Sequence, residues 1–539
     1  MLRKQLKSLP ATLPQTYERI LLNIGQDYRQ YALKILQWLT YSKEPLSLLQ
    51  LAEVVAVDED EDPRFDPERR FPEPEDILLI CSSLVTATEE DCDYFSDDDE
   101  ASYDDEVSDD DSRQRRRMRV VKVKLAHFSV KEYLVSSQIT NGEASHYSIR
   151  ETDANVRIAR DCLSYMLFFT DDIPEPSIFE EEWVCSKFPL ARYAARQWTV
   201  HARASEQINE ESMIELITEL FTSEGNAFSS WCLDKYPQSE TPLYYTSKED
   251  LVGVVERLIT MGVDVNAPSG SYDNALCTAS AAGNTEIVKL LLGAGADPNS
   301  LKHGWKHGSA LYQASKCGYD ANAIVRLLLD AGAKAGLEEG NIGDTALHVA
   351  AANGNANIVE MLINSGMDVN LKGTRISFTF QKYALGLAGV YGNIETVRLL
   401  LEAGANSDSK DDALCFAASQ GDDETVKLLL GAGANINQVG GWKDPLRRAV
   451  TSGYATTVKI LLDAGADVNL GGSWNRDPFV NPLFDSFDRE KRREDLEVLE
   501  LLVAAGARII GLEEMMKELK DEIELGDKVE LHEKLSQRD

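Results

Sequence analysis

The sequence predicts a mainly α-helical protein whose second half is a solenoid built from pairs of helices. One phrase recurs from about residue 241 onward, and its cleanest copy is GDTALHVAAANGNANIVEMLINSGMDVN at 343–370. The leucine that anchors each copy returns after 33, 35, 36, 38, 29, 32 and 37 residues. Apolar residues within a copy follow helical spacing. A period of this length is the signature of a repeat architecture.

Each copy contains two predicted helices. In the cleanest copy Leu347, Ala350 and Ala351 lie three and four positions apart, so they form one apolar stripe on a short first helix. Gly354 is expected to end that helix in a left-handed conformation, and Gly366 to end the second helix in the same way. The second helix has its apolar face at Ile358, Val359, Leu362 and Ile363. No repeat buries its own face, so stability must come from stacking.

The anchoring leucines are Leu243, Leu276, Leu311, Leu347, Leu385, Leu414, Leu446 and Leu483. Eight copies with this sequence pattern resemble ankyrin repeats, and the resemblance covers roughly half of the chain. It implies an ankyrin α-solenoid with β-hairpin turns over 240–510. The end copies match least well, as capping repeats do, and capping helices are expected over 511–539.

The first half has a different order of elements. Helices are predicted at 16–24, 27–42 and 47–57, and a fourth at 72–85 that runs into a strand. The alternating segment RVVKVKLAHF predicts a second strand at 119–128, and SVKEYLVS a closing helix at 129–136. Ser129 and Glu132 have the spacing of a capping box at the start of that helix. This order is that of a winged-helix domain, which we expect over 1–140.

Several motifs of this half point to one family. The segments LPATLPQTYERIL at 9–21 and LAHFSVKEYLVS at 125–136 resemble the winged-helix module of fungal NACHT-type STAND proteins, which is often labelled after the GPI inositol-deacylase. FPLARYAARQWTVHA at 188–202 resembles the helical segment that joins this module to ankyrin repeats, which implies a helical linker domain over 141–239. The resemblance implies a sensor or scaffold that binds a protein partner through its repeats.

The chain departs from that family in one respect. An NTPase module normally precedes the winged helix, yet no G-x-x-x-x-G-K-[ST] phosphate loop occurs and the dipeptide Gly-Lys is absent. No G-x-S-x-G nucleophile elbow occurs either. We therefore expect no enzyme activity and no cofactor. Two alternatives stay open: the C-terminal part of a signalling NTPase, and a nuclear regulator that uses the winged helix.

The distribution of charge and of possible metal ligands argues against nucleic acid, membranes and metal ions as partners. The net charge of −35 repels nucleic acid and anionic membranes, and the candidate recognition helix at 47–62 carries no Lys or Arg. The eight cysteines are scattered without CxxC spacing, which favours reduced thiols and a cytoplasmic location, with the nucleus as an alternative. His303 and His307 lack an accompanying carboxylate, and His127 and His348 are expected to be structural. We expect no metal.

A charged block at 89–119 separates the two predicted strands. It holds fourteen acidic residues before an arginine cluster, and its composition predicts a disordered insertion at the tip of the hairpin. A regulatory role is the alternative, because three serines have an acid three positions later and are candidate phosphorylation sites: Ser96, Ser102 and Ser108.

Large side chains precede several anchors, in turns that do not need them for their geometry. They are Tyr272, Trp305, Lys306, Trp442, Lys443, Trp474 and Arg476. Exposed aromatic and cationic residues are common energetic anchors of interfaces, so these seven are the predicted partner-binding residues. The alternative is that the tryptophans pack between neighbouring turns.

Overall fold

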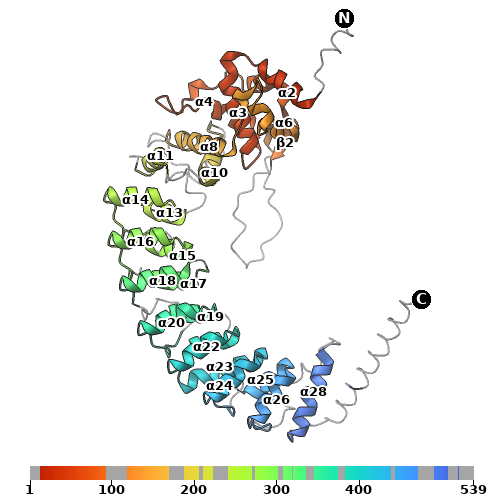
Figure 1. The fold of residues 1–539 in the computed structure, drawn as a ribbon, viewed down its shortest axis with the longest axis vertical. Coiled ribbons are helices and arrows are strands. Elements are labelled where there is room, and N and C mark those ends of the chain that lie inside the picture. Colours follow the sequence, from red (N-terminus) through yellow and green to blue (C-terminus); the bar gives the residue numbers. More distant parts are fainter. Residues whose placement is uncertain are drawn as a thin grey trace, which may run out of the picture. The chain divides into compact units, whose positions relative to one another are not determined.

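The computed structural model places most of the residues that it describes in helices (Figure 1). It describes residues 12–92, 118–168, 187–204, 210–222, 241–269, 274–300, 308–318, 320–334, 345–373, 383–438, 444–470, 491–507 and 520. The chain divides into two compact units, Met1–Val263 and Asp264–Asp539.

The first unit begins with short helices around a small sheet. In order these are α2 (Leu13–Leu22), η1 (Gln26–Tyr28), α3 (Arg29–Tyr41), β1 (Leu46–Ser47), α4 (Leu48–Ala56), η2 (Pro67–Arg69), α5 (Asp76–Cys81), η3 (Ser82–Leu84), β2 (Val85–Cys92), β3 (Met118–Leu125), α6 (Phe128–Leu134), α7 (Ser137–Thr140) and η4 (Ser145–Tyr147). The sheet has the order β1-β3-β2, and both pairs are antiparallel. The four predicted helices and both predicted strands are present.

The structure corrects the bounds of the charged insertion. Backbone pairing between β2 and β3 continues through Glu89 opposite Val121 to Cys92 opposite Met118. The predicted start at residue 89 and end at residue 119 are therefore wrong, because both ends of the block belong to the ladder. Glu89 and Glu90 are exposed, so a strand edge can carry them at little cost. Residues 93–117 lie outside the described residues.

The predicted capping box at Ser129 and Glu132 is also wrong. Helix α6 begins at Phe128, and its N-cap is His127, whose Nδ1 accepts a hydrogen bond from the Ser129 amide at 3.2 Å. The Ser129 hydroxyl is instead bonded to the Tyr17 hydroxyl at 2.8 Å, a partner 112 residues away that local spacing cannot reveal. A capping box does occur at the start of α4, between Ser47 and Gln50.

Longer helices complete the first unit: α8 (Glu151–Met166), α10 (Ala191–Ala204), α11 (Glu211–Thr222), α13 (Pro242–Lys248) and α14 (Val252–Thr260). Helix α8 packs against α3, α10 and α11, so the predicted winged-helix and linker regions share one core. Trp38, Tyr165 and Trp198 are among its largest fully buried side chains. The helices of the first predicted repeat, α13 and α14, fall within this unit.

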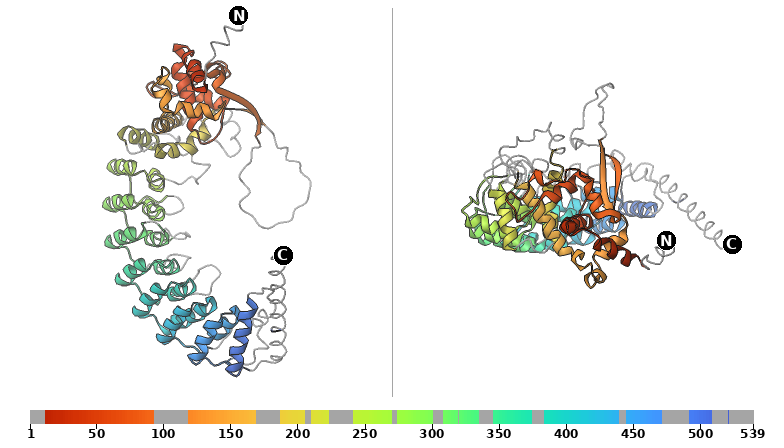
Figure 2. Two further views of the ribbon diagram at one scale, coloured as in Figure 1. Left: turned by 45° about the vertical axis from the view of Figure 1, so that its right-hand side comes forward. Right: turned by 90° about the horizontal axis from the view of Figure 1, so that it is seen from above.

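The second unit is a stack of helix pairs (Figure 2). Its helices are α15 (Ala275–Ala282), α16 (Thr285–Gly293), α17 (Ala310–Lys316), α18 (Ala321–Asp330), α19 (Ala346–Ala352), α20 (Ala356–Asn364), α21 (Ala384–Val390), α22 (Ile394–Glu402), α23 (Ser407–Gln420), α24 (Asp423–Gly431), α25 (Pro445–Ser452), α26 (Ala455–Asp463) and α28 (Lys491–Ala504). First helices pack on first helices and second on second, as stacking repeats require. In Figure 1 the first helices line the inner side of this curved unit.

The predicted anchors form the core of this stack. The six that lie in its described part are all 2% exposed or less: Leu276, Leu311, Leu347, Leu385, Leu414 and Leu446. Leu483 and the predicted capping segment lie outside the described residues, apart from Lys520. Gly354 and Gly366 have φ of +68° and +89°, so both glycines adopt the predicted left-handed conformation.

An asparagine links successive repeats. Asn437 at the end of one copy donates from Nδ2 to the carbonyl of Gly465 at 3.3 Å, and its Oδ1 accepts from the amide of Asp467 at 2.8 Å. Both partners belong to the turn that follows the next helix pair. The same arrangement recurs at Asn266, Asn299 and Asn370. The terminal asparagine of the repeat phrase is thus a bridge between neighbours.

One copy breaks this pattern. Asn406 caps α23, which begins at the next residue, so a helical turn precedes Leu414 where the general pattern over 240–510 predicts a β-hairpin turn. Asp411 on this helical turn accepts from the amide of Asn435 at 2.7 Å, and Lys410 donates to the carbonyl of Ala432 at 3.2 Å. The 29-residue interval is short because α23 follows Asn406 directly.

Replacing Asn437 by alanine removes both bridging hydrogen bonds. We expect the free energy of unfolding of the second unit to fall by about 1–2 kcal/mol, since each net hydrogen bond contributes about 1 kcal/mol. Urea unfolding followed by circular dichroism measures this change. Asn357→Ala on α20 is the matched control, because Asn357 is exposed and no hydrogen bond of its side chain is present in the described part of the chain. An equal loss in both variants would contradict the bridging role.

Candidate functional site

The predicted site residues do not fall on the described part of the chain. Tyr272, Trp305, Lys306, Trp442, Lys443, Trp474 and Arg476 all lie outside the described residues, as do Ser96, Ser102 and Ser108. The structural role expected for His348 is confirmed, because it is 1% exposed and its Nδ1 lies 2.9 Å from the Thr345 hydroxyl and accepts from the Thr345 amide. Other candidate groups lie on the described surface of the repeats and in the core of the first unit.

The inner face of the second unit carries an apolar stripe. Residues two and five positions after an anchor lie roughly opposite it on a helix, and so point away from the buried leucine. At three successive copies one residue at these positions is half-buried, namely Val349, Val390 and Phe416, although Leu387, also two positions after an anchor, is fully buried. Tyr391 follows directly at the end of α21 and is 57% exposed. Three neighbouring first helices thus present apolar and aromatic groups to solvent.

Cationic residues stand at both ends of this stripe. The copy before it has the exposed Lys316 at the corresponding position, and the copy after it has the half-buried Arg448. Burial lowers the pKa of Arg448, and the nearby Cys415 opposes that effect. A groove of about 680 Å³ lies beside Lys316, between the ends of α17 and α19, and is lined by polar residues such as Asn353 and Asn355. The described residues of this face thus combine an apolar stripe with polar and cationic side chains at its ends.

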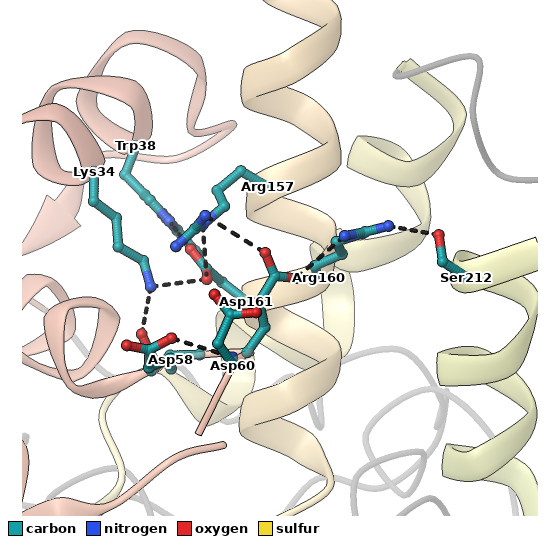
Figure 3. A network of polar contacts seen from close by, with 10 residues as sticks. Lys34, Trp38, Asp58, Asp60, Arg157, Arg160, Asp161 and Ser212 are labelled. Carbon is teal, nitrogen blue, oxygen red and sulfur yellow. Dashed lines mark hydrogen bonds and ion pairs between the residues drawn. The ribbon is translucent and has the colours of Figure 1, made fainter. Parts of the chain in front are cut away.

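The first unit contains a buried polar network centred on Asp161 of α8 (Figure 3). The Asp161 carboxylate receives the Trp38 Nε1–H at 2.9 Å and pairs with the Lys34 ammonium at 2.8 Å. Lys34 also donates to the carbonyl of Val57 at 2.6 Å. Asp161 and Lys34 are 1% and 7% exposed. The network therefore joins α3 to α8 through groups that are shielded from water.

The outer part of the network reaches two further segments. Glu59, in the loop after α4, pairs with Arg157 at 3.5 Å and with Arg160 at 3.3 Å. Arg160 in turn donates to the Ser212 hydroxyl on α11 at 2.6 Å (Figure 3). The arrangement ties the loop, α8 and α11 together.

The chemistry of the network is that of a structural ion pair. Burial lowers the pKa of Lys34, while the Coulombic attraction and hydrogen bond of Asp161 act in the opposite direction. The printed ion pairs of the network join Asp161 to Lys34 and Glu59 to Arg157 and Arg160. Sequence reasoning missed the network because Lys34 and Asp161 are 127 positions apart, without a local pattern.

A second buried group, His201 on α10, is held in a chain of hydrogen bonds. Its Nε2 lies 2.8 Å from the Tyr193 hydroxyl, and its Nδ1 lies 2.8 Å from Oδ1 of Asn155. The Tyr193 hydroxyl also accepts from the Lys43 amide at 3.1 Å. Burial, and then the charge of Lys43, lower the pKa of His201 to about 4. The imidazole is therefore neutral at pH 7 and fully bonded, which suits a structural role.

The described residues hold neither a candidate metal site nor a candidate membrane span. Within the described ranges, three or more His, Cys, Asp or Glu residues never gather as they would to hold a metal ion. Across the same ranges, helices that combine the length and the apolar character needed to cross a bilayer were not found.

Comparison with known proteins identifies the repeats. Residues 203–302, 276–373 and 385–471 match the family model described as "Ankyrin repeats (3 copies)". The chain therefore contains ankyrin repeats, and its mainly helical solenoid has the architecture that the repeat period predicted. The matches leave residues 1–202 unassigned.

Individual proteins are similar to parts of this chain. The azaphilone pigments biosynthesis cluster protein L of Monascus ruber is 32% identical over 320 residues, which are 54% of this chain and 61% of that protein. The ankyrin repeat and KH domain-containing protein mask-1 of Caenorhabditis elegans is 32% identical over 143 residues, or 26% of this chain and 5% of that protein. The chain thus spans less than two thirds of the length of these relatives. The human ASB11 ankyrin repeat domain aligns over 42% of this chain and 99% of its own, with 26% identity and a TM-score of 0.37.

Proposed function

We propose that this ankyrin-repeat chain is a non-enzymatic scaffold that binds a protein partner through the inner face of its second unit. The observation that carries the proposal is the apolar stripe formed by Val349, Val390, Tyr391 and Phe416 on three successive first helices. A soluble surface seldom exposes neighbouring aromatic groups without a binding role, and aromatic anchors supply much of the energy of protein interfaces.

The charges around the stripe suggest which partner fits. Lys316 and Arg448 are cations in a chain whose net charge is −35, and they flank the apolar groups. A partner segment with apolar side chains and an acidic residue opposite the exposed Lys316 would complement this face.

The first unit extends the proposal to a sensor of the NACHT or STAND type. Its elements follow the order α3, β1, α4, α5, β2, β3, and the antiparallel sheet has the order β1-β3-β2. That succession supports a winged-helix module, and its candidate recognition helix, α4, has the sequence LLQLAEVVA without a cation. DNA binding through α4 is disfavoured for that reason, since contacts to phosphates need Lys or Arg. The relative from a fungus supports the fungal setting.

The binding proposal is tested by substituting the stripe. Tyr391→Ala combined with Phe416→Ala should reduce capture of the partner that the wild-type chain retains by at least tenfold, which corresponds to about 1.4 kcal/mol. The melting temperature should change little for Tyr391, which is mostly exposed. Phe128→Ala is the control, since Phe128 is an aromatic residue that is 68% exposed in the first unit.

A second variant separates the two candidate surfaces. Alanine at Trp305, Trp442 and Trp474 together tests the turns that the sequence singled out. Loss of capture in this variant, with full capture by the Tyr391 and Phe416 variant, would move the binding site from the inner helices to the turns. Full capture by both variants would contradict the proposal.

The absence of a phosphate loop from the sequence leads to a further expected result. The purified chain should release phosphate from ATP or GTP no faster than a buffer blank, because nothing in the sequence provides the backbone cradle and lysine that hold the phosphates. A coupled phosphate-release assay over a range of nucleotide concentrations measures this. Turnover that saturates with nucleotide and persists through repeated purification would refute the non-enzymatic assignment.

A further inference from the structure

The first unit has an apolar groove that neither the repeats nor the polar network uses. It lies between the end of α2, η1 and α5, and it encloses about 500 Å³. The residues that line it are Ile20, Asn23, Ile24, Gly25, Tyr28, Phe71, Asp76, Leu79 and Ile80. Leu79 is 75% exposed and Tyr28 is 48% exposed. A groove of this composition leaves large apolar groups in water that an occupant would cover.

A further exposed apolar residue lies at the start of α2. Leu13 and Ile20 are seven positions apart, about two helical turns, so they share one face of α2. Leu13 is 58% exposed. At about 1.5 Å per residue, Leu13 lies only about 10 Å along the axis from Ile20. The point where the preceding segment of the chain enters α2 is therefore close to the groove, and an exposed apolar side chain marks it.

The rim of the groove is acidic. Asp76 lines it directly, and Asp27 adjoins Tyr28 on η1. Glu73 and Glu75 are exposed just before α5. An occupant with apolar side chains and positive charges would complement both the floor and the rim.

One segment of this chain has that composition. Residues 1–11, MLRKQLKSLPA, carry leucines at positions 2, 6 and 9 and three cations, Arg3, Lys4 and Lys7, without an acid. The leucines are four and three positions apart, the spacing of one helical face. In the rest of the chain acids exceed bases by 90 to 52. This segment is therefore an unusual source of positive charge in an acidic protein.

The segment 1–11 is long enough to reach the groove. Residues 1–11 lie outside the described residues and join the structure at Thr12, directly before Leu13. Eleven residues span about 16 Å as a helix and up to about 36 Å when extended. Either length covers the roughly 10 Å from Leu13 to Ile20 after a reversal of direction at the Leu-Pro-Ala sequence.

We propose that the segment 1–11 docks in this groove, with its leucines on the apolar floor and its cations against the acidic rim. The contact is intramolecular, so the effective concentration of the segment is on the order of millimolar. A basic apolar segment of another protein must displace it to reach the groove. The groove is then a self-occluded docking site, distinct from the stripe on the repeats.

A labelled synthetic peptide of residues 1–11 tests this docking by fluorescence anisotropy. The full-length chain with Leu2→Glu and Leu6→Glu, here the open variant, should bind the peptide at least tenfold more tightly than the wild-type chain, whose groove is already occupied. Adding Leu79→Glu to the open variant should abolish binding. Adding Leu49→Glu should not, because Leu49 is a leucine of α4 that is 50% exposed and does not line the groove.

The outcomes that overturn the proposal are specific. Equal affinity of the peptide for the wild-type chain and the open variant would show that the segment does not occupy the groove. Failure of the peptide to bind either protein would show that the groove does not accept this chemistry. Sedimentation of the wild-type chain as a dimer that Leu79→Glu dissociates would show that a second copy is the occupant. Higher salt should weaken the predicted binding, because its charges lie at an exposed rim.

Discussion

Asp161→Ala is expected to lower the free energy of unfolding of the first unit by about 3–5 kcal/mol, the usual effect of removing one member of a buried ion pair. The substitution leaves the Lys34 ammonium, 7% exposed, without its carboxylate at 2.8 Å. It also removes the acceptor of the Trp38 indole N–H. Hydrogen exchange of α3 and α8 as a function of urea reports the change in this unit separately from the repeats.

Two further variants separate the contribution of the Asp161 charge to stability from the contribution of side-chain packing. Asp161→Asn keeps an acceptor for Trp38 but removes the charge, so its loss should be smaller than that of Asp161→Ala. Lys34→Met combined with Asp161→Leu replaces the pair by apolar groups and should recover much of the loss, since a desolvated pair gains little over apolar packing.

The control for this experiment is an exposed ion pair in the same unit. Glu219 pairs with Arg64 at 2.9 Å, but its side chain is half exposed. Glu219→Ala should therefore cost less than about 1 kcal/mol. A similar cost for Asp161→Ala and Glu219→Ala would refute the central role of the buried network.

His201 should make the first unit sensitive to acid. Its pKa is about 4 in the folded chain, against an ordinary value of 6.5. Between these two values the unfolded chain binds a proton that the folded chain does not, so the free energy of unfolding falls as the pH is lowered from 6.5 to 4. The stabilisation is complete above pH 6.5. The difference in pKa corresponds to a loss of roughly 3 kcal/mol.

Substituting the imidazole isolates this effect. His201→Gln can still bond to Tyr193 and Asn155 but does not titrate, so stability should fall less steeply between pH 6.5 and 4 than in the wild type. Urea unfolding at several pH values, read by exchange of amides in α10, measures both slopes. Identical slopes would show that other groups cause the acid sensitivity. Tyr193→Phe should lower the free energy of unfolding at pH 7 relative to the wild type, because it removes the hydroxyl that lies 2.8 Å from Nε2 of His201.

The turns of the second unit show where local sequence is insufficient. The repeat motif correctly predicts the left-handed conformation of Gly354 and Gly366 and the burial of the anchoring leucines in the described copies. It does so because the same stacking environment recurs from copy to copy. The 29-residue interval before Leu414 indicates that this copy has a shorter turn than the others. That a helical turn takes its place depends on the hydrogen bonds of Lys410 and Asp411 to the next repeat. Those partners lie 22 and 24 positions away.

The sequence by itself determined the solenoid and its period, because the same pattern returns along the chain at nearly regular intervals. It also determined the first helices of the first unit, whose apolar residues recur within a few positions. Only the tertiary structure decided how α3, α8 and α11 share one polar network, where α6 begins, and which apolar groups stay exposed beside α5. Lys34 meets Asp161, and Tyr17 meets Ser129, across more than 100 positions. A pair at such a distance leaves no periodic trace, since its partners are chosen by packing and not by neighbours in the chain.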